Sequence, residues 1–428
     1  MSRPGSRPRA VVIATGSELV RGERTDRNGP FLAAEALRYG LEPARITIVG
    51  DAPAELEAAF REGLAADACL VSGGLGPTHD DRTVELVARA ARLELVVDEA
   101  LEREIETVSR AVAERLRRPY ADFAPGVTKQ ATRPESAVSI GLAGTAPGLV
   151  FRASTGCVVV ILPGPPGELR RLWPNALAAE PMQELLARTR PPGRRVLRLF
   201  GVSESGVARA LEEAGGDGDG VEATICARDF EIHVDLVVEP EADERADRLE
   251  TALVERLERW VFARDERRVE ELVLTLAAAR GLLLATAESC TGGMVAARLT
   301  DVPGSSASFV GGIVAYADEV KRAELGVPEE LLVEHGSVSA EVAAAMAEGA
   351  RERLRADVAV AVTGVAGPGG GTPEKPVGLV HLHAAGPDGS LSRVLDLPGD
   401  RAQVRLRATV TALHLLRALL TGSRDEGV

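Results

Sequence analysis

Ser289 has the setting in this chain that most favours chemistry, because its hydroxyl lies where an apolar strand turns into a helix. The run Leu282 to Leu284 predicts a buried strand, and Thr291 to Leu299 predicts a helix. Backbone N–H groups at a helix start have no partner within the helix and can hold an oxyanion. We expect three residues to provide them: Thr291, Gly292 and Gly293. Ser289 is then either a nucleophile or an N-cap before glycines that allow close helix packing.

Two groups that could take a proton from Ser289 follow the apolar run Phe309 to Ala315. Tyr316 and Lys321 each carry a side chain that can serve as the base a neutral hydroxyl requires. The alternative is that Tyr316 is a half-buried ring and Lys321 a solvated surface charge, with no part in catalysis. Cys290 is either a core thiol or a second nucleophile, and no His lies nearby in the sequence.

A glycine-rich loop follows the strand predicted from Val358 to Val362 and continues to Lys375. Its backbone N–H groups can approach a ligand closely, so the loop predicts a phosphate cradle at a strand end. It is not a Walker A loop, because no Lys-Ser or Lys-Thr follows its last glycine. A mobile surface loop is the alternative. The residues expected to bind substrate are Thr363, Gly364, Gly367, Gly369 and Gly370.

Two further loops follow predicted strands near the N-terminus, Ala10 to Thr15 and Ala68 to Ser72. They predict a nucleotide site made of Glu18, Asp26, Asn28, Gly73, Gly74, Gly76 and Thr78. Asp80 and Asp81 offer hard oxygen ligands to a divalent cation, or they cap the helix that begins near Arg82. The stretch 72–77 shares a hydroxyl residue, two glycines and a proline with 363–368 at equal offsets, which suggests a phosphate-handling loop in each terminal domain.

The order of the predicted elements favours an α/β protein with more than one domain. At 428 residues the chain is long for a single domain. Strands and helices alternate through short connections before residue 173 and after residue 266, which predicts two doubly wound domains with parallel sheets. The segment between them predicts two strands and a helix but no cluster of catalytic residues. We therefore expect it to have a structural or linking role.

Charge and cysteine content argue against several classes of function. The net charge is −14 and no Lys/Arg-rich run occurs, so we expect no nucleic-acid partner. The four cysteines (Cys69, Cys157, Cys226 and Cys290) lie in or beside apolar runs, as expected of reduced core thiols in a cytoplasmic protein. No apolar run reaches the length of a transmembrane helix, so we expect no membrane partner.

The C-terminal motifs resemble those of the nicotinamide mononucleotide deamidases of the CinA family. The resemblance rests on Ala287-Glu-Ser-Cys-Thr-Gly-Gly293, Val302-Pro-Gly-Ser-Ser306, Ala315-Tyr316 with Lys321, Leu325-Gly-Val-Pro328, His335-Gly-Ser-Val-Ser339, and Ala361 to Gly378. It implies that Ser289 attacks the nicotinamide carboxamide with help from Tyr316 and Lys321, and that ammonia leaves without any cofactor. Ser308 and Asp318 stand where the family usually has Tyr and Asn.

The N-terminal motifs resemble the molybdopterin-binding (MoaB/MogA-like) domain of full-length CinA proteins. They are Thr15-Gly-Ser-Glu-Leu19, Asp26-x-Asn28, Gly73-Gly-Leu-Gly-Pro-Thr-x-Asp-Asp81, Gly144-Thr-Ala-Pro-Gly148 and Leu162-Pro-Gly-Pro-Pro-Gly167. The resemblance implies an ADP-ribose pyrophosphatase activity that depends on a divalent cation, with or without a monovalent cation. Arg27, Val127 and Gly141 replace a small Thr and two asparagines of the family pattern.

The resemblance covers nearly the whole chain and implies three domains and a homodimer. The expected domains are a molybdopterin-binding-like domain at 1–173, a small α+β KH-like linking domain at 174–265, and a deamidase domain at 266–428. The expected partners are two small molecules, nicotinamide mononucleotide and ADP-ribose. The alternative function is that of a non-catalytic molybdopterin-binding or competence-associated regulatory protein.

Overall fold

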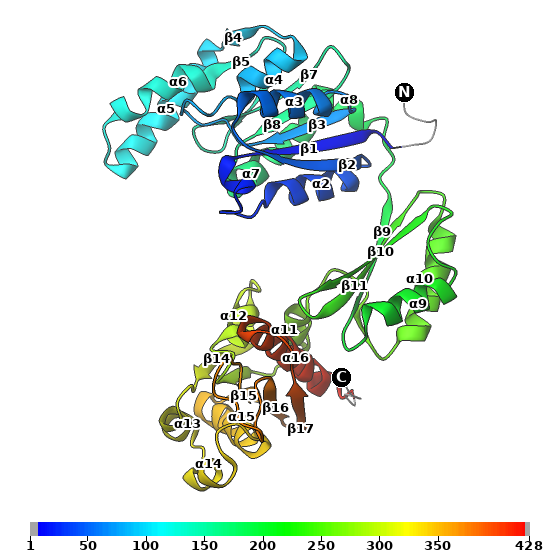
Figure 1. Cartoon of the computed structure of the whole chain (residues 1–428), viewed down its shortest axis with the longest axis vertical. Helices are drawn as coiled ribbons and strands as arrows, with labels where there is room; N and C mark the ends of the chain where they lie inside the picture. The colour runs from blue at the N-terminus through cyan, green and yellow to red at the C-terminus, as the bar shows by residue number, and fades with distance from the viewer. Residues whose placement is uncertain (1–6, 424–428) are drawn as a thin grey trace. The chain divides into compact units, whose positions relative to one another are not determined.

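The computed structural model describes residues 7–423, and these divide into two compact units after Gly193. The N-terminal unit is built on a six-stranded sheet with the order β2-β1-β3-β8-β7-β6 (Figure 1). Its strands are β1 (Arg9–Thr15), β2 (Glu42–Val49), β3 (Ala68–Ser72), β6 (Val138–Leu142), β7 (Pro147–Arg152) and β8 (Val158–Leu162).

Four strands of this sheet are parallel, as predicted, and two are not. The strands β2, β1, β3 and β8 pair in parallel, whereas β7 pairs antiparallel with both β8 and β6. The connections at 143–146 and 153–157 are too short for a crossover, so they force antiparallel neighbours. The expectation of a wholly parallel sheet was therefore wrong at this edge.

Helices cover both faces of the sheet, so two cores form. The helices are α1 (Ser17–Val20), α2 (Asn28–Arg38), α3 (Pro53–Gly63), α4 (Thr83–Ala91), α7 (Pro166–Ala178) and α8 (Glu180–Leu186). Alternate residues of a strand point to opposite faces. In β1, Ile13 joins the core that contains Phe60 of α3, and Val12 joins the core that contains Trp173 of α7.

A small lobe projects from this unit and holds α5 (Glu99–Leu116), the short helix η1 (Tyr120–Asp122), α6 (Ala124–Ala131) and the strand pair β4 (Leu95–Val97) and β5 (Thr132–Pro134). Val127 is buried there in a cluster with Leu101 and Ile105. An asparagine at this position would bury an amide among apolar side chains, so the departure from the family pattern has a packing reason.

Helix α7 continues past residue 173, where the sequence placed a domain boundary. The boundaries at 173 and 265 remain predictions.

The second unit begins with a small α+β segment whose sheet has the order β10-β11-β9-β12. Its elements are β9 (Gly193–Leu199), α9 (Glu204–Glu213), β10 (Val221–Arg228), β11 (Glu231–Val238), α10 (Asp243–Leu257) and β12 (Val261–Ala263). The sequence predicted β9, α9 and β11 but not β10, β12 or α10. This middle segment has a core of its own, which includes Leu197, Val234 and Leu253.

The C-terminal domain holds a five-stranded sheet with the order β14-β13-β15-β16-β17. The strands are β13 (Leu284–Glu288), β14 (Phe309–Val314), β15 (Val358–Gly364), β16 (Leu379–Gly386) and β17 (Gly389–Asp396). The helices are α11 (Val269–Ala279), α12 (Met294–Thr300), η2 (Ser305–Ala307), α13 (Asp318–Leu325), α14 (Glu329–His335), α15 (Ala340–Leu354) and α16 (Arg401–Thr421). Separate cores lie on the two sides of the sheet, one under α11 and α16 and one under α13 and α15. Two α/β domains and a small α+β segment thus confirm the predicted fold class.

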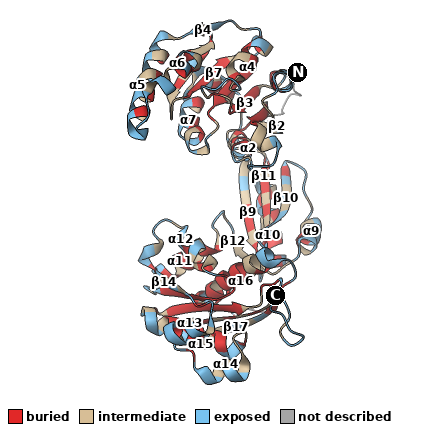
Figure 2. Cartoon of the chain, turned by 60° about the vertical axis from the view of Figure 1, so that its left-hand side comes forward, coloured by how far each residue is buried: buried red, intermediate tan, exposed pale blue. Residues whose placement is uncertain are grey.

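Helix α16 is buried over most of its length (Figure 2). It contacts α11, β15, β16 and β17.

None of the described helices is both long and apolar enough to cross a bilayer.

Candidate active sites

The carboxyl edge of three parallel strands gathers the residues predicted for the C-terminal site. Strand β13 pairs in parallel with β14 and β15, which places Glu288 beside Val314 and Val362. Backbone hydrogen bonds continue this register past the strand end, from Ser289 N to Val362 O at 2.9 Å. At this edge Ser289 follows β13 directly, Tyr316 lies two positions after the end of β14, and Thr363 is the last residue but one of β15.

The turn after Ser289 differs from the predicted helix start. Gly292 and Gly293 have φ angles of 60° and 94°, which a right-handed helix cannot contain, so α12 begins after them. The N–H of Gly292 donates to Ser289 O at 3.1 Å, and that of Gly293 donates to a Glu288 carboxylate oxygen at 2.9 Å. Two of the three expected oxyanion donors already have partners, which corrects the prediction made for Thr291, Gly292 and Gly293 as a group.

The buried carboxylate of Glu288 caps helix α12. It also accepts hydrogen bonds from the N–H groups of Val295 at 3.1 Å and Ala296 at 2.9 Å. A carboxylate at a helix N-terminus is favoured by the helix dipole and fixes the chain that precedes the helix. The N-cap position is occupied by Gly293, so Ser289 does not act as an N-cap. Its side chain is 8% exposed and remains the candidate nucleophile.

Lys321 lies in the core next to the site, with 1% of its surface exposed. Its Nζ lies 3.1 Å from an oxygen of Asp318 and 3.4 Å from the carbonyl oxygen of Tyr316. Asp318 also accepts a hydrogen bond from the Ser337 hydroxyl at 2.6 Å. Burial raises the pKa of Asp318, but the hydrogen bonds from Ser337 and Lys321 outweigh it and leave that pKa lowered. The surface-charge alternative for Lys321 is therefore wrong.

Tyr316 has a largely exposed ring, and its hydroxyl accepts a hydrogen bond from Arg401 at 2.8 Å. In the described part of the chain, no hydrogen bond joins the Ser289 hydroxyl to Tyr316 or to Lys321. The structure therefore places the three predicted catalytic residues around one strand edge without linking them directly.

The glycine loop after β15 combines strand residues with a turn. Thr363 and Gly364 lie in β15, where the Thr363 hydroxyl donates to Ser337 O at 2.7 Å. Gly367 and Gly370 have φ angles of 78° and 83°, so the loop turns at these two positions. Gly369 lies in open space, with no atom within 4 Å of the place a Cβ would take. A ligand can therefore approach the backbone at Gly369 and Gly370 more readily than at Gly364.

Two arginines that the sequence analysis missed join these segments. Arg401 donates to Gly367 O at 2.8 Å as well as to Tyr316. Arg405 donates to Cys290 O at 3.0 Å and to Thr291 O at 2.9 Å, so it holds the loop after Ser289. Arg401 and Arg405 are four positions apart on α16, and a capping box marks the start of this helix. The sequence could therefore have indicated that both side chains lie on the same face of the helix.

The Cys290 thiol is buried beside the candidate nucleophile. Burial raises the pKa of Cys290 to about 11, so the thiol stays protonated at neutral pH. The structure therefore favours Cys290 as a core thiol and leaves Ser289 as the candidate nucleophile. Cys69 and Cys157 are also buried, but Cys226 on the edge strand β10 is exposed, so the prediction of a core thiol was wrong there.

The predicted N-terminal site is divided between separate cavities. Glu18, Asp26 and Asn28 line a cavity of about 570 Å³, together with Thr15 and Arg27. The Asn28 amide donates to Ser72 Oγ at 2.8 Å and to Gly164 O at 2.7 Å. The Thr15 hydroxyl is buried and has no hydrogen-bond partner among residues 7–423, which suits a cavity that receives a polar ligand.

The glycines of the second loop line two smaller cavities. Gly74, Gly76 and Asp81 line cavities of about 230 and 280 Å³. A Cβ at Gly74 would lie 2.1 Å from Thr83 Oγ1, so only glycine fits there. Glu168, which the sequence analysis did not select, lines the larger of the two, and burial raises the pKa of its carboxyl group.

Asp80 and Asp81 both interact with Thr78. The Thr78 hydroxyl donates to both carboxylates, and its N–H donates to Asp81 at 3.0 Å. The hydrogen bond from Thr78 lowers the pKa of Asp80. Between residues 7 and 423, no three His, Cys, Asp or Glu side chains form a group that could hold a metal ion.

Comparisons with known proteins match both ends of the chain. Residues 11–182 match the family described as a probable molybdopterin binding domain, and residues 266–420 match the CinA C-terminal domain. A CinA-like protein of Mycolicibacterium gilvum is 45% identical over 97% of this chain and 99% of its own length, and one of Mycolicibacterium vanbaalenii is 44% identical over the same shares. A crystal structure of a competence/damage inducible protein from Agrobacterium tumefaciens is 47% identical, covers 35% of this chain and 94% of that one, and gives a TM-score of 0.34. The chain belongs to the CinA family.

Proposed function

We propose that the C-terminal domain hydrolyses the carboxamide of nicotinamide mononucleotide to give nicotinate mononucleotide and ammonia. The observation that carries the proposal is the meeting of Ser289, Tyr316 and Thr363 at one strand edge, with the glycine loop beside it. Hydrolysis of such a substrate requires a nucleophile that attacks the amide carbon, groups that transfer protons, and a loop that binds the phosphate. No cofactor is needed for this reaction.

In the proposed mechanism Ser289 Oγ bonds to the carboxamide carbon, and the serine proton passes to the leaving nitrogen, so ammonia departs from an acyl-serine. Water then adds to the acyl carbon, which releases the carboxylate and restores the hydroxyl. Lys321 supplies a buried cationic or basic group, and its contact with Asp318 fixes its position. Tyr316 is held by Arg401 for proton transfer or for contact with the pyridine ring.

Substrate recognition is assigned to the loop and to the arginine beside it. Backbone N–H groups near Gly369 and Gly370 are proposed to bind the 5′-phosphate. Arg401 hydrogen-bonds both Gly367 of the glycine loop and Tyr316. Its positive charge therefore lies between the loop proposed to bind the phosphate and the residues proposed to act on the carboxamide.

The test is the release of ammonia from nicotinamide mononucleotide by Ser289→Ala. We expect the rate to fall by roughly 10³-fold or more, because a covalent nucleophile has no substitute in alanine. The fold should persist, since the N-cap of α12 is Gly293 and its capping carboxylate is Glu288. Ser390→Ala, which changes an exposed serine of β17, is the matched control and should keep the wild-type rate.

A retained rate in Ser289→Ala would refute the serine mechanism. A wild-type chain that binds nicotinamide mononucleotide but never releases ammonia would favour the non-catalytic regulatory alternative.

We also propose that the N-terminal domain cleaves the pyrophosphate of ADP-ribose with a divalent cation. Two features support this proposal: the cavity lined by Thr15, whose hydroxyl has no hydrogen-bond partner in the described part of the chain, and the carboxylates of Asp80 and Asp81. Asp80 and Asp81 fit a magnesium-type cation, which commonly binds through one or two carboxylates and the phosphates of its substrate. The cation would neutralise charge on the pyrophosphate. A cytoplasmic homodimer, with no nucleic-acid or membrane partner, completes the proposal.

A further inference from the structure

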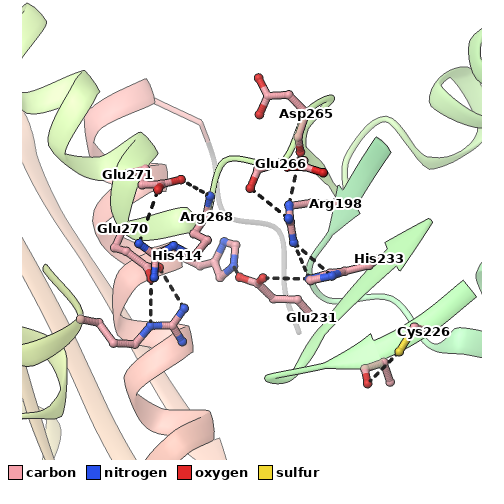
Figure 3. Close-up of polar contacts among 12 residues, drawn as sticks. Arg198, Cys226, Glu231, His233, Asp265, Glu266, Arg268, Glu270, Glu271 and His414 are labelled. Carbon is pink, nitrogen blue, oxygen red and sulfur yellow. Dashed lines mark hydrogen bonds and ion pairs between the residues drawn. The ribbon is translucent and has the colours of Figure 1, made fainter. Parts of the chain in front are cut away.

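A buried carboxylate and a buried imidazole join the middle segment to the C-terminal domain (Figure 3). His414 Nε2 on α16 donates to a carboxylate oxygen of Glu231, the first residue of β11, at 2.7 Å. Their exposed fractions are 2% and 5%. The His414 ring stacks on Phe200 with a centroid distance of 3.8 Å and meets the edge of Phe262 at 4.7 Å. Side chains from β11, β12, α16 and the position just after β9 therefore form one closed contact.

The charge of Glu231 is compensated within this contact. Burial alone would raise the pKa of Glu231, but its contacts with His233 and His414 outweigh burial and lower the pKa to about 2. His233 lies 3.6 Å from Glu231, and Arg198 approaches both ring nitrogens of His233 at 3.0 and 2.9 Å. A paired charge in a buried setting holds its neighbours in a defined geometry, because misalignment leaves the charge uncompensated.

Helix α16 connects this contact to the Ser289 loop. Arg405 lies nine positions before His414, or roughly 13.5 Å along the helix axis at 1.5 Å per residue. The same helix therefore carries His414 at the middle segment and Arg405 on the carbonyl oxygens of Cys290 and Thr291. A helix hydrogen-bonded between these positions transmits a shift at one end to the other.

A second connection runs through α11 and α12. Arg198 of β9 donates to Asp265 O at 3.2 Å and to Glu266 O at 2.9 Å, just before α11 (Figure 3). The buried carboxylate of Glu270 on α11 accepts from Arg298 of α12 at 2.9 Å. Helix α12 begins directly after the Ser289 loop, so that loop is connected to the middle segment by two routes, one through α16 and one through α11 and α12.

We propose that Glu231 and His414 are positioning residues of the deamidase site, through which the middle segment holds α16 and thereby keeps Arg405 against the loop that carries Ser289. This inference rests on the function proposed for the Ser289 site. It gives the middle segment a part in the chemistry of its neighbour, where the sequence indicated only a structural or linking role.

The experiment compares Glu231→Ala, Glu231→Gln and Asp235→Ala in the full chain, with nicotinamide mononucleotide as substrate. Glu231→Ala should lower kcat roughly 10- to 100-fold, the effect of a small displacement of catalytic groups, while KM changes by less than about threefold. Glu231→Gln keeps an oxygen that accepts from His414 and should recover most of kcat. Asp235 lies on the same strand and pairs with Arg194, so Asp235→Ala should match wild type.

Hydrogen exchange supplies a readout that does not depend on activity. In Glu231→Ala, amides between Ser289 and Val295 should exchange faster than in wild type and in Asp235→Ala. If Glu231→Ala does not fold, Phe200→Leu removes the ring stacked on His414 and should show the same changes, in smaller measure.

Unchanged exchange and unchanged kcat in the folded variants would overturn the inference. Faster exchange in a protein whose wild type releases no ammonia would retain the contact between the segments and refute the proposed reaction instead.

Discussion

Two loops with the same spacing of residues lie at strand ends in the two units, yet their backbones differ. The stretches 72–77 and 363–368 share a hydroxyl residue, two glycines and a proline at equal offsets. In the first, Gly73 and the next glycine leave the strand at once, with φ angles of 104° and 65°. In the second, Gly364 remains in β15 and the first positive φ comes at Gly367.

The neighbouring strands explain the difference. Gly364 pairs with Val380 of β16, an antiparallel strand that runs on past the end of the parallel part of the sheet and keeps the chain extended. Strand β3 has only parallel neighbours, β1 and β8, which end at the same edge. A spacing of glycines therefore allows a turn, while the adjacent strand decides where the turn occurs. The cavities follow the early turn at Gly74.

If the two regions carry separate chemistry, substitutions should affect one activity and spare the other. Among the substitutions that test this comparison, the largest effect is expected from Lys321→Met, which should lower the rate of deamidation by roughly 10²- to 10⁴-fold, as when proton transfer is lost. Cleavage of ADP-ribose should be unchanged. Arg322→Met, at the neighbouring exposed position, is the control. A normal deamidation rate in Lys321→Met would remove Lys321 from the mechanism.

The reverse experiment changes both carboxylates of the N-terminal loop. Asp80→Ala with Asp81→Ala should lower cation-dependent cleavage of ADP-ribose by about 10²-fold, because charge on the pyrophosphate is no longer stabilised. The release of ammonia from nicotinamide mononucleotide should stay at the wild-type rate. If this double variant loses deamidation while correctly folded, the N-terminal domain must regulate the C-terminal site.

The smallest effects are expected from substitutions of one glycine in each loop, and the quantity measured is the free energy of unfolding. Gly74→Ala should lower the free energy of unfolding of the N-terminal unit by roughly 1–3 kcal/mol, because it combines a positive φ with a contact on Thr83. Gly369→Ala has open space and should change stability by less than about 0.5 kcal/mol. Chemical denaturation checks both, and equal losses would contradict the difference between the loops.

Much of the fold could be predicted because its strands are apolar runs that end in glycine loops. The α/β alternation and the strands β1, β3 and β15 follow from that pattern. The strand predicted at Leu282 to Leu284 was misplaced, because β13 begins only at Leu284 and continues to Glu288. The antiparallel edges and strand β10 could not, since β10 is an edge strand whose residues alternate towards solvent and carry no continuous apolar run.

The candidate site was predicted in part. Ser289, Tyr316 and Lys321 stand in short local motifs, and the structure places all three at or beside one strand edge. Arg405 and Glu231 were missed because their roles depend on contacts across many positions of the sequence, which no local pattern contains. The donors expected at Gly292 and Gly293 failed for a related reason, since Gly293 donates to the Glu288 carboxylate and Gly292 donates to Ser289 O.

The order of synthesis adds a consequence for the Ser289 loop. Arg405 binds carbonyl groups that precede it by 115 and 114 positions, so the loop leaves the ribosome long before the guanidinium that holds it. The N-terminal unit has its own cores and can fold while the rest of the chain is still being made. A ribosome that stalls before Arg401 would therefore release a chain with a folded first unit and an unsupported serine. An intact Ser289 loop would thus be found only in chains whose synthesis had passed Arg405.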